Sequence, residues 1–145
     1  MDSGGVGAVT FSTNFKHDLD TRADRKAQRD TERDAAWRAC RKAVDARDHR
    51  DCRCCGQGTN PDDIGLIRGH RHHIVYRSAG GLDTSQNVIT LCWTCHNAEH
   101  KSRLRIDVID AALGANGPVE FWRTDEAGAW FLSRRELDVH RVEQD

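Results

Sequence analysis

The chain of 145 residues has no run of about 18 apolar residues, and no apolar segment typical of a secretion signal stands at its N-terminus. Neither membrane insertion nor passage into an oxidising compartment is therefore indicated. The six cysteines are expected to be free thiols or metal ligands, because disulfides persist mainly in oxidising compartments. A cytoplasmic protein without a membrane partner is expected.

An excess of charge of one sign is also missing. The chain carries 22 Lys and Arg against 23 Asp and Glu, a formal charge of -1, so no global positive field draws it to nucleic acid. The distribution is uneven: residues 16–50 hold 11 basic and 8 acidic side chains, residues 51–105 hold 7 and 5, and residues 106–145 hold 4 and 9. Basic charge in the first two segments favours local phosphate contacts over tight autonomous binding.

What the chain does contain is metal-ligand chemistry. Four cysteines form two CxxC pairs, Cys52 with Cys55 and Cys92 with Cys95. Together they supply the tetrahedral set of thiolates that structural zinc prefers. Gly56 directly follows the first pair and suits the unusual backbone angles of such a turn. Cys40 and Cys54 stand outside the CxxC spacing and are interpreted as spare thiols.

A folded unit is predicted between the two pairs, because their separation exceeds the ~15 to 20 residues of a simple zinc ribbon. Residues 67–76 and 87–92 are rich in β-branched and apolar side chains and predict two short strands. The segment SAGGLDTSQ between them supplies a turn. After Cys92 the sequence WTCHNAEHKSRL has no breaker and predicts a helix, which makes the unit ββα.

Histidines gather on this unit. His96 and His100 are four residues apart on the predicted helix, so both imidazoles project from the same face. Three more histidines, His70, His72 and His73, lie on the preceding strand. A zinc ion that already holds four thiolates has no vacancy, so the histidines predict a second metal site.

Residues 52–104, a little over a third of the chain, resemble an HNH endonuclease of the ββα-metal type, in the subgroup with a four-cysteine zinc. The resemblance rests on the HHIV strand, the RSAGG turn, the central asparagine of QNVITLC and the CxxCHxxxH end. It implies a metal-dependent enzyme that hydrolyses phosphodiester bonds in DNA. One departure is Tyr76, which stands where the family often has proline.

The resemblance also assigns roles. It makes His73 the general base and Asn87 the residue that braces the hairpin and orients this base. The ligands of the catalytic ion are then His72, His96 and His100. His70 competes with His72 as the strand ligand, because residues two apart share a strand face, and the resemblance favours His72. A free imidazole, with a pKa near ~6.5, can take a proton from water at neutral pH.

Each of the two sites is expected to hold an ion of its own. The cysteines would hold a structural Zn²⁺. Imidazoles suit transition metals, so Mn²⁺, Ni²⁺ or Zn²⁺ is expected to support activity at least as well as Mg²⁺, which prefers oxygen ligands. Cations around the motif are expected to contact DNA phosphates, namely Arg71, Arg77, Lys101 and Arg103.

The fold class predicted is α+β, a small ββα-metal core in one domain of modest size. We expect a flexible N-terminus at residues 1–15, a charged helix at residues 16–50, the nuclease core at residues 51–105, and a hairpin with an acidic tail at residues 106–145, packed on the core. The helix has an apolar stripe only in its second half, at Trp37, Cys40 and Val44. The hairpin is predicted from the runs VEFW and AWFL around TDEAG.

The alternative function from another class is a non-catalytic zinc module that binds nucleic acid or a protein partner. The complete set of histidines and Asn87 argues against it, because a binder has no need of them. Within the enzyme class, phage packaging, homing, restriction and nicking remain open. No domain that would recognise a defined DNA site is visible, so the chain is expected either to rely on a partner, such as a phage packaging or restriction component, or to cleave with little sequence preference. It is expected to act in the cytoplasm of a bacterial or phage-infected cell.

Overall fold

The computed structural model of the chain describes residues 14–60, 62–63, 65 and 67–136. Most of the N-terminal segment expected to be flexible lies outside these residues, as does the expected acidic tail beyond Glu136. The chain divides into two compact units, Met1–Ala35 and Ala36–Asp145, and each is described by itself.

Helix α1 (Asn14–Asp48) begins in the first unit and ends in the second. The stretch from Asp18 to Asp48 contains no proline or glycine, a composition that favours a helix. In the first unit a hydrogen bond of 3.0 Å from Gln28 to Glu32 links successive turns. Among the described helices, none combines the length and the hydropathy that a membrane span requires.

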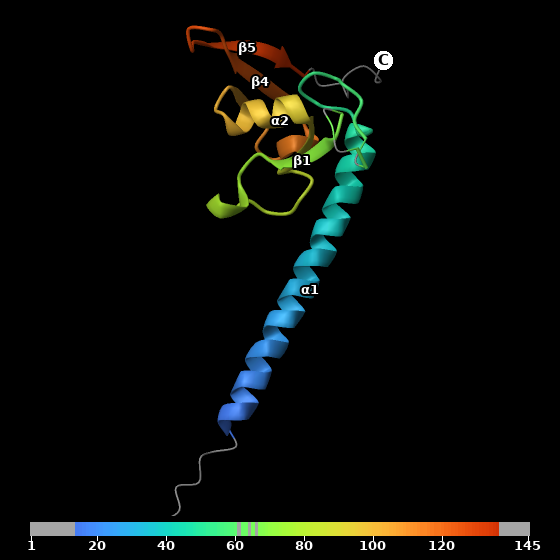
Figure 1. The fold of residues 1–145 in the computed structure, drawn as a ribbon, viewed down its shortest axis with the longest axis vertical. Helices are drawn as coiled ribbons and strands as arrows, with labels where there is room; N and C mark the ends of the chain where they lie inside the picture. Colours follow the sequence, from blue (N-terminus) through green and yellow to red (C-terminus); the bar gives the residue numbers. More distant parts are fainter. Residues whose placement is uncertain (1–13, 61, 64, 66, 137–145) are drawn as a thin grey trace, which may run out of the picture. The chain divides into compact units, whose positions relative to one another are not determined.

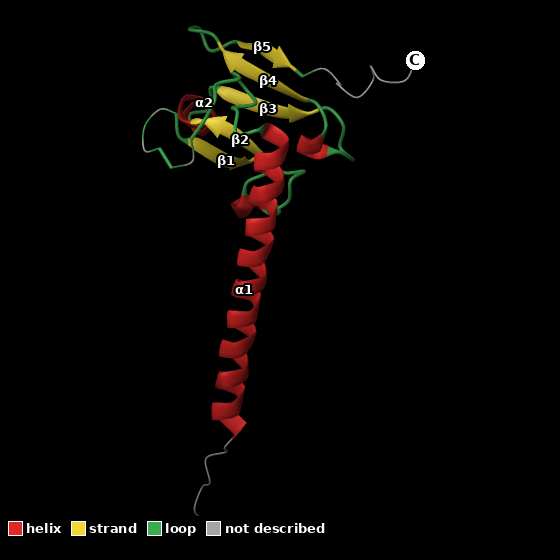
Figure 2. Cartoon of the chain, turned by 90° about the vertical axis from the view of Figure 1, so that its right-hand side faces the viewer, coloured by secondary structure: helices red, strands yellow, loops and turns green. Residues whose placement is uncertain are grey.

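The second unit contains the predicted ββα element. Strand β1 (Gly69–His73) pairs antiparallel with β2 (Val88–Cys92), and helix α2 (Trp93–His100) follows directly. All five side chains of β2 are buried, because this short apolar strand is covered on both faces. The strands are shorter than the predicted ranges, and the 3-10 turn η1 (Arg77–Ala79) lies in the loop between them. Figure 2 shows this pair of strands beside α2.

A second sheet has the strand order β3 (Leu104–Val108), β4 (Val119–Thr124) and β5 (Trp130–Arg135), all antiparallel. The hairpin of β4 and β5 confirms the interpretation of the two aromatic runs, and it is visible in Figure 1. The 3-10 turn η2 (Gly114–Asn116) precedes β4. Helices and antiparallel sheets in one chain confirm the predicted α+β class.

The main core lies between α2 and the two sheets. It contains Ile89 and Leu91 of β2 with Val119 and Phe121 of β4, and the cysteines of the predicted zinc site are part of it. A second cluster joins the last turns of α1 to the start of β2 through Cys40, Val44, Val88 and Trp37. The buried carboxylate of Asp48 accepts a hydrogen bond of 2.8 Å from the backbone N–H of Thr90, so the end of α1 is fixed to β2.

Candidate active site and metal centres

The four cysteines of the CxxC pairs come together as predicted. Each offers one Sγ atom, and the ligand atoms of this cluster all lie within 4.8 Å of one another: Cys52, Cys55, Cys92 and Cys95. Gly56 has a φ of +78°, and its N–H donates to the carbonyl of Cys52 over 2.7 Å, so the first pair sits on a tight turn that needs glycine. The second pair spans the junction of β2 and α2.

The electrostatics of this cluster suit a cation. A hydrogen bond with Cys95 and burial raise the pKa of the Cys52 thiol to about 12, and burial raises the pKa of Cys92. Thiols this close cannot ionise together unless a cation balances their charge. Four sulfur atoms around one point fit a soft, tetrahedral ion such as zinc.

Arg123 of β4 also contacts the sulfur atoms here, and no sequence pattern had indicated it. Its Nη2 donates to Sγ of Cys95 over 3.1 Å and to Sγ of the buried Cys54 over 3.3 Å. Hydrogen bonding with Cys95, together with the charge of Arg123, lowers the pKa of Cys54 despite its burial. The guanidinium therefore places a positive charge against the sulfur atoms from the side of the second sheet.

The histidines form the second cluster. Ring nitrogens of His72, His96 and His100 all lie within 4.8 Å of one another, and Nε2 of His96 is 3.1 Å from Nε2 of His100. His72 is 3% exposed, and its buried Nε2 has no hydrogen-bond partner within the described residues. Burial, and then the neighbouring histidines, lower the pKa of His72 and of His96 to about 4. Neutral imidazoles with free lone pairs fit a divalent cation.

His70 and His72 share the face of β1 that is turned toward α2. The ring of His70 stacks on that of His96, with centroids 4.4 Å apart and an interplanar angle of 8°. Nε2 of His70 is buried without a hydrogen-bond partner in the described chain. The three-histidine cluster contains His72 and not His70, so His70 lies beside the candidate ion site as a stacking neighbour.

Glu99 and Tyr76 border the same cluster. Oε2 of Glu99 is 3.4 Å from Nε2 of His72, and the hydroxyl of Tyr76 donates to the Glu99 carboxylate over 2.6 Å. The ring of Tyr76 stacks on that of His100, with centroids 5.9 Å apart. Burial and the hydrogen bond with Glu99 raise the pKa of Tyr76 to about 12. Tyr76, the departure from the family pattern, thus holds a carboxylate next to the histidines.

His73 and Arg71 lie on the other face of β1, which is turned toward α1. Nε2 of His73 is 2.8 Å from Oδ1 of Asp83, and its ring stacks on that of Trp37 with centroids 5.3 Å apart. Since the Asp83 carboxylate accepts from Nε2–H, Nδ1 of the neutral ring keeps its lone pair. Nε of Arg77 donates to the same Asp83 oxygen over 2.8 Å.

Asp83 and Trp37 are site residues that the sequence reasoning missed. Burial alone would raise the pKa of the Asp83 carboxyl, but hydrogen bonds from Arg77 and His73 outweigh it and lower this pKa below its ordinary value. The Arg77 guanidinium also lies over the Trp37 ring, 4.6 Å from its centroid. The His73 imidazole is therefore held between an ionised carboxylate and an aromatic ring.

Asn87 fixes the loop that follows β1. Its Oδ1 accepts from the N–H of Val75 over 2.8 Å, and its Nδ2 donates to the carbonyls of Val75 and Leu82 over 3.0 and 3.1 Å. A Cβ atom at Gly81 would lie 1.7 Å from the carbonyl oxygen of Val75, so only glycine permits this approach. These hydrogen bonds are those expected of a residue that braces the hairpin. That Asn87 also orients His73 stays a prediction.

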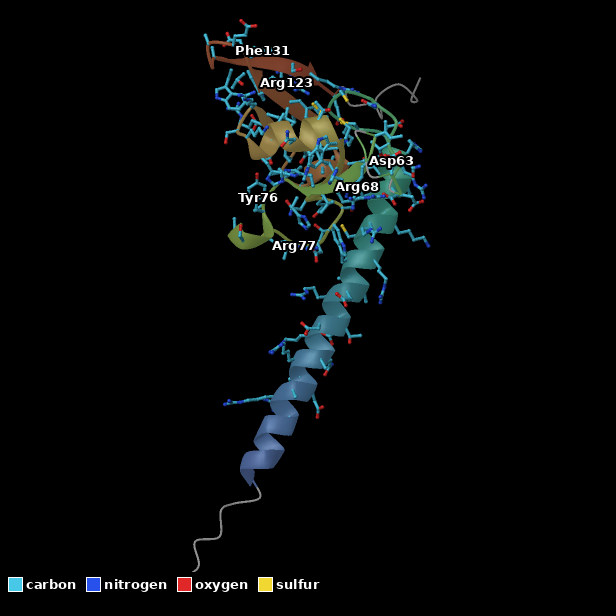
Figure 3. All side chains as sticks on the ribbon, in the orientation of Figure 1. Asp63, Arg68, Tyr76, Arg77, Arg123 and Phe131 are labelled. Atoms are coloured by element: carbon cyan, nitrogen blue, oxygen red, sulfur yellow. The ribbon has the colours of Figure 1, made fainter. Side chains whose placement is uncertain are left out.

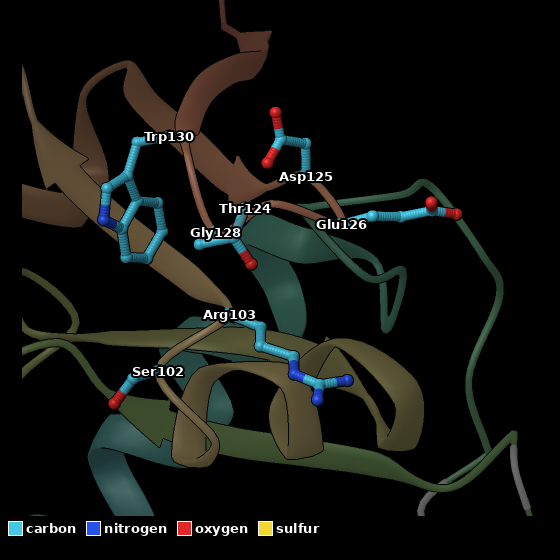
Figure 4. A pocket seen from close by; sticks show the side chains of 7 residues that line it. All are labelled: Ser102, Arg103, Thr124, Asp125, Glu126, Gly128 and Trp130. Carbon is cyan, nitrogen blue, oxygen red and sulfur yellow. The ribbon is translucent and has the colours of Figure 1, made fainter.

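The cations expected to contact DNA lie in different surroundings. The Arg77 side chain is 54% exposed, whereas that of Arg71 is 8% exposed and its Nε donates to Asp45 over 2.8 Å. Lys101 and Arg103 are exposed after α2. Arg103 lines a hollow of about 820 Å³ with Ser102, Thr124, Asp125, Glu126, Gly128 and Trp130 (Figure 4). Figure 3 shows Tyr76 and Arg77 well apart from Arg123.

Comparisons with known proteins match the part of the chain that carries both clusters. Residues 52–102 match the family model described as HNH endonuclease. Over 41 residues, the chain is 42% identical to Anaredoxin of Nostoc sp. (strain PCC 7120 / SAG 25.82 / UTEX 2576), a similarity that covers 28% of this chain and 54% of that protein. The chain thus spans about half the length of the curated relative it matches. No solved structure matches it.

Proposed function

Because residues 52–102 belong to the HNH endonuclease family, we propose that the chain is a metal-dependent endonuclease that hydrolyses phosphodiester bonds in DNA. The observation that carries this proposal is a pair of neighbours on β1. His72 joins His96 and His100 in a cluster suited to a cation, and His73, the next residue, has its imidazole fixed by Asp83.

His73 is the general base of the proposed reaction. Its Nδ1 takes a proton from the attacking water, while Asp83 holds Nε2–H and stabilises the imidazolium that forms. The water oxygen bonds to phosphorus, and the bond from phosphorus to the 3′ oxygen breaks. A divalent cation, when bound by the three histidines, would offset the negative charge that develops on the phosphate and the departing 3′ oxygen.

Arg77 has the geometry to hold the substrate phosphate. Asp83 and the Trp37 ring fix its guanidinium beside His73, and about half of the side chain faces solvent. An arginine positioned in this way can donate to a phosphate oxygen while keeping its own position. Exposed Lys101 and Arg103 would contact phosphates further along the backbone.

The four-cysteine cluster is proposed to hold zinc in a structural role. It lies in the main core between α2 and the two sheets, where it would link the turn at Cys52 to the start of α2. In a unit of this size, a bound ion adds folding free energy that a small apolar core does not supply. The histidine cluster would take Mn²⁺, Ni²⁺ or Zn²⁺ at least as well as Mg²⁺.

The proposal is tested by the nicking of supercoiled plasmid by the purified full-length chain. EDTA should abolish nicking, and excess Mn²⁺ or Ni²⁺ should restore it. The second candidate function, a non-catalytic zinc module, predicts a shift in DNA mobility with no nicked or linear plasmid under any ion. That result, in a folded preparation with metal at the cysteines, would replace the nuclease by the binding module.

A further inference from the structure

A basic hollow lies on the last turns of α1, outside the residues that match the nuclease family. It has a volume of about 330 Å³ and is lined by Arg38, Arg41, Lys42, Asp45 and Arg50. All of these residues belong to the second unit. Four of the five side chains are cationic, and all four cationic residues are exposed.

The helix period explains why these side chains converge. Spacings of three and four residues place Arg38, Arg41, Lys42 and Asp45 on one flank of α1, next to the stripe of Trp37 and Val44 that is packed inward. Arg50 joins them after the helix ends. His49 and Arg50 both have positive φ values, 52° and 63°, so two consecutive left-handed residues turn the chain at this point.

The single carboxylate of the hollow is already neutralised. Nε of Arg71 donates to Asp45 over 2.8 Å, and this arginine comes from β1, beneath the helix. The four cations that line the hollow make no ion pair within the part of the chain that the structure describes. The field at the basic hollow is therefore positive, and it suits an anion.

The larger hollow near β5 differs in its charge, because it contains two exposed carboxylates. There Arg103 stands with the exposed carboxylates of Asp125 and Glu126, for which the described residues supply no ion pair (Figure 4). A polyanion would meet two negative charges there. The basic hollow on α1 is therefore the stronger candidate for a phosphate backbone.

The basic hollow is connected to the candidate active site through one strand. Arg71, which holds Asp45, and His73 lie on the same face of β1, two residues apart. Their backbones are therefore about 7 Å apart. The basic hollow and the candidate active site are thus linked through neighbouring residues on one face of this strand.

We propose that the basic hollow binds the phosphate backbone of duplex DNA on one side of the cleavage position. This inference rests on the proposed nuclease function, because it names the surface that holds the substrate of that site. Contacts from four cations to phosphates would supply affinity without sequence preference and release counterions from the duplex.

The test measures binding of a labelled duplex by fluorescence anisotropy at several salt concentrations. Full-length His73→Ala is the parent, so the duplex stays intact. Adding Arg38→Gln and Lys42→Gln should weaken binding roughly 10- to 60-fold at 0.1 M salt and reduce the slope of log affinity against log salt by about 2. Arg25→Gln with Arg29→Gln is the matched control, with the same spacing on exposed turns of the same helix.

Unchanged affinity in the Arg38 and Lys42 variant would overturn the proposal, and so would an equal loss in the control pair. Circular dichroism and zinc content verify that each variant is folded. The nuclease proposal is judged separately, by plasmid nicking with the unmodified chain. If the variant binds more weakly and the unmodified chain does not nick plasmid, the DNA-binding surface is supported and the nuclease proposal is rejected. If the unmodified chain nicks plasmid and the variant binds as its parent does, the nuclease proposal is supported and the DNA-binding surface is rejected.

Discussion

Nε2 of His73 lies 2.8 Å from Oδ1 of Asp83, so the proposed base is oriented by a carboxylate ten residues further along the chain. The same oxygen accepts a hydrogen bond from Arg77, and the rings of Trp37 and His73 stack. Four side chains from α1, β1 and the following loop thus form one contiguous group. It includes the last residue of β1, His73, which directly follows His72 of the three-histidine cluster.

Replacing Asp83 by asparagine should slow plasmid cleavage by roughly 10² to 10⁴, because a general base that loses the carboxylate orienting it can lose most of its effect. The amide lacks the negative charge that stabilises the imidazolium, so the loss should fall on kcat, with KM for DNA nearly unchanged. Steady-state nicking rates at several plasmid concentrations separate the two constants.

Asp62→Asn is the matched control, because it removes an exposed carboxylate that makes no hydrogen bond or ion pair with His73 in the described part of the chain. It should leave both constants unchanged. Wild-type cleavage by Asp83→Asn would show that the bond between His73 and Asp83 has no part in the reaction.

Loss of one sulfur from the four-cysteine cluster should unfold the second unit. Purified protein is expected to contain about one tightly bound zinc at this cluster, and Cys92→Ser should lose it and aggregate or melt at a much lower temperature. Cys40→Ser is the control, since Cys40 is a buried thiol outside the cluster and its replacement should leave the zinc in place. Metal analysis that finds no zinc in folded protein would contradict the assignment.

Acid should destabilise the protein when no ion occupies the histidines. Burial lowers the pKa of His72 and His96 from 6.5 to about 4 in the folded state. Between these two pH values the unfolded chain takes up protons that the folded chain does not, so the free energy of unfolding should be constant above pH 6.5 and fall as the pH drops toward 4.

The measurement is a series of urea midpoints from pH 7.5 to 4.5, with the cysteine-bound ion retained and the histidines kept free of metal. A double variant, His72→Asn with His96→Asn, should show a flatter profile than the wild type. An equally steep decline in both proteins would mean that other groups cause the acid sensitivity.

The ββα unit and the grouping of the cysteines could be predicted because their signals are local. Periodicity indicates strands and helices, and a CxxC turn brings its own two sulfurs together whatever the rest of the fold does. The four-residue spacing of His96 and His100 likewise places them on one helix face before any tertiary contact is known. Strand β3 was not predicted: Leu104, Ile106 and Val108 alternate with charged residues, but the predicted helix was extended through Leu104, and the pairing of β3 with β4 is a tertiary contact.

The partners of these residues could not be predicted. Arg123 lies 69 residues after Cys54, and no pattern in the sequence shows that β4 packs against the cysteines. Trp37 belonged to an apolar stripe that indicated burial, but not burial against His73. Asp83 lies in a turn, where the direction of a side chain depends on the tertiary fold and not on periodicity.

The central claim is that His73 acts as the general base while His96 binds the ion, and variants that remove each residue separately test it most directly. Plasmid nicking and ion binding at the histidine cluster should be measured together for the wild type, His73→Ala and His96→Ala. We expect His73→Ala to retain the ion and cleave roughly 10² to 10⁴ times more slowly, and His96→Ala to lose both. Cleavage by His73→Ala at the wild-type rate would contradict the account.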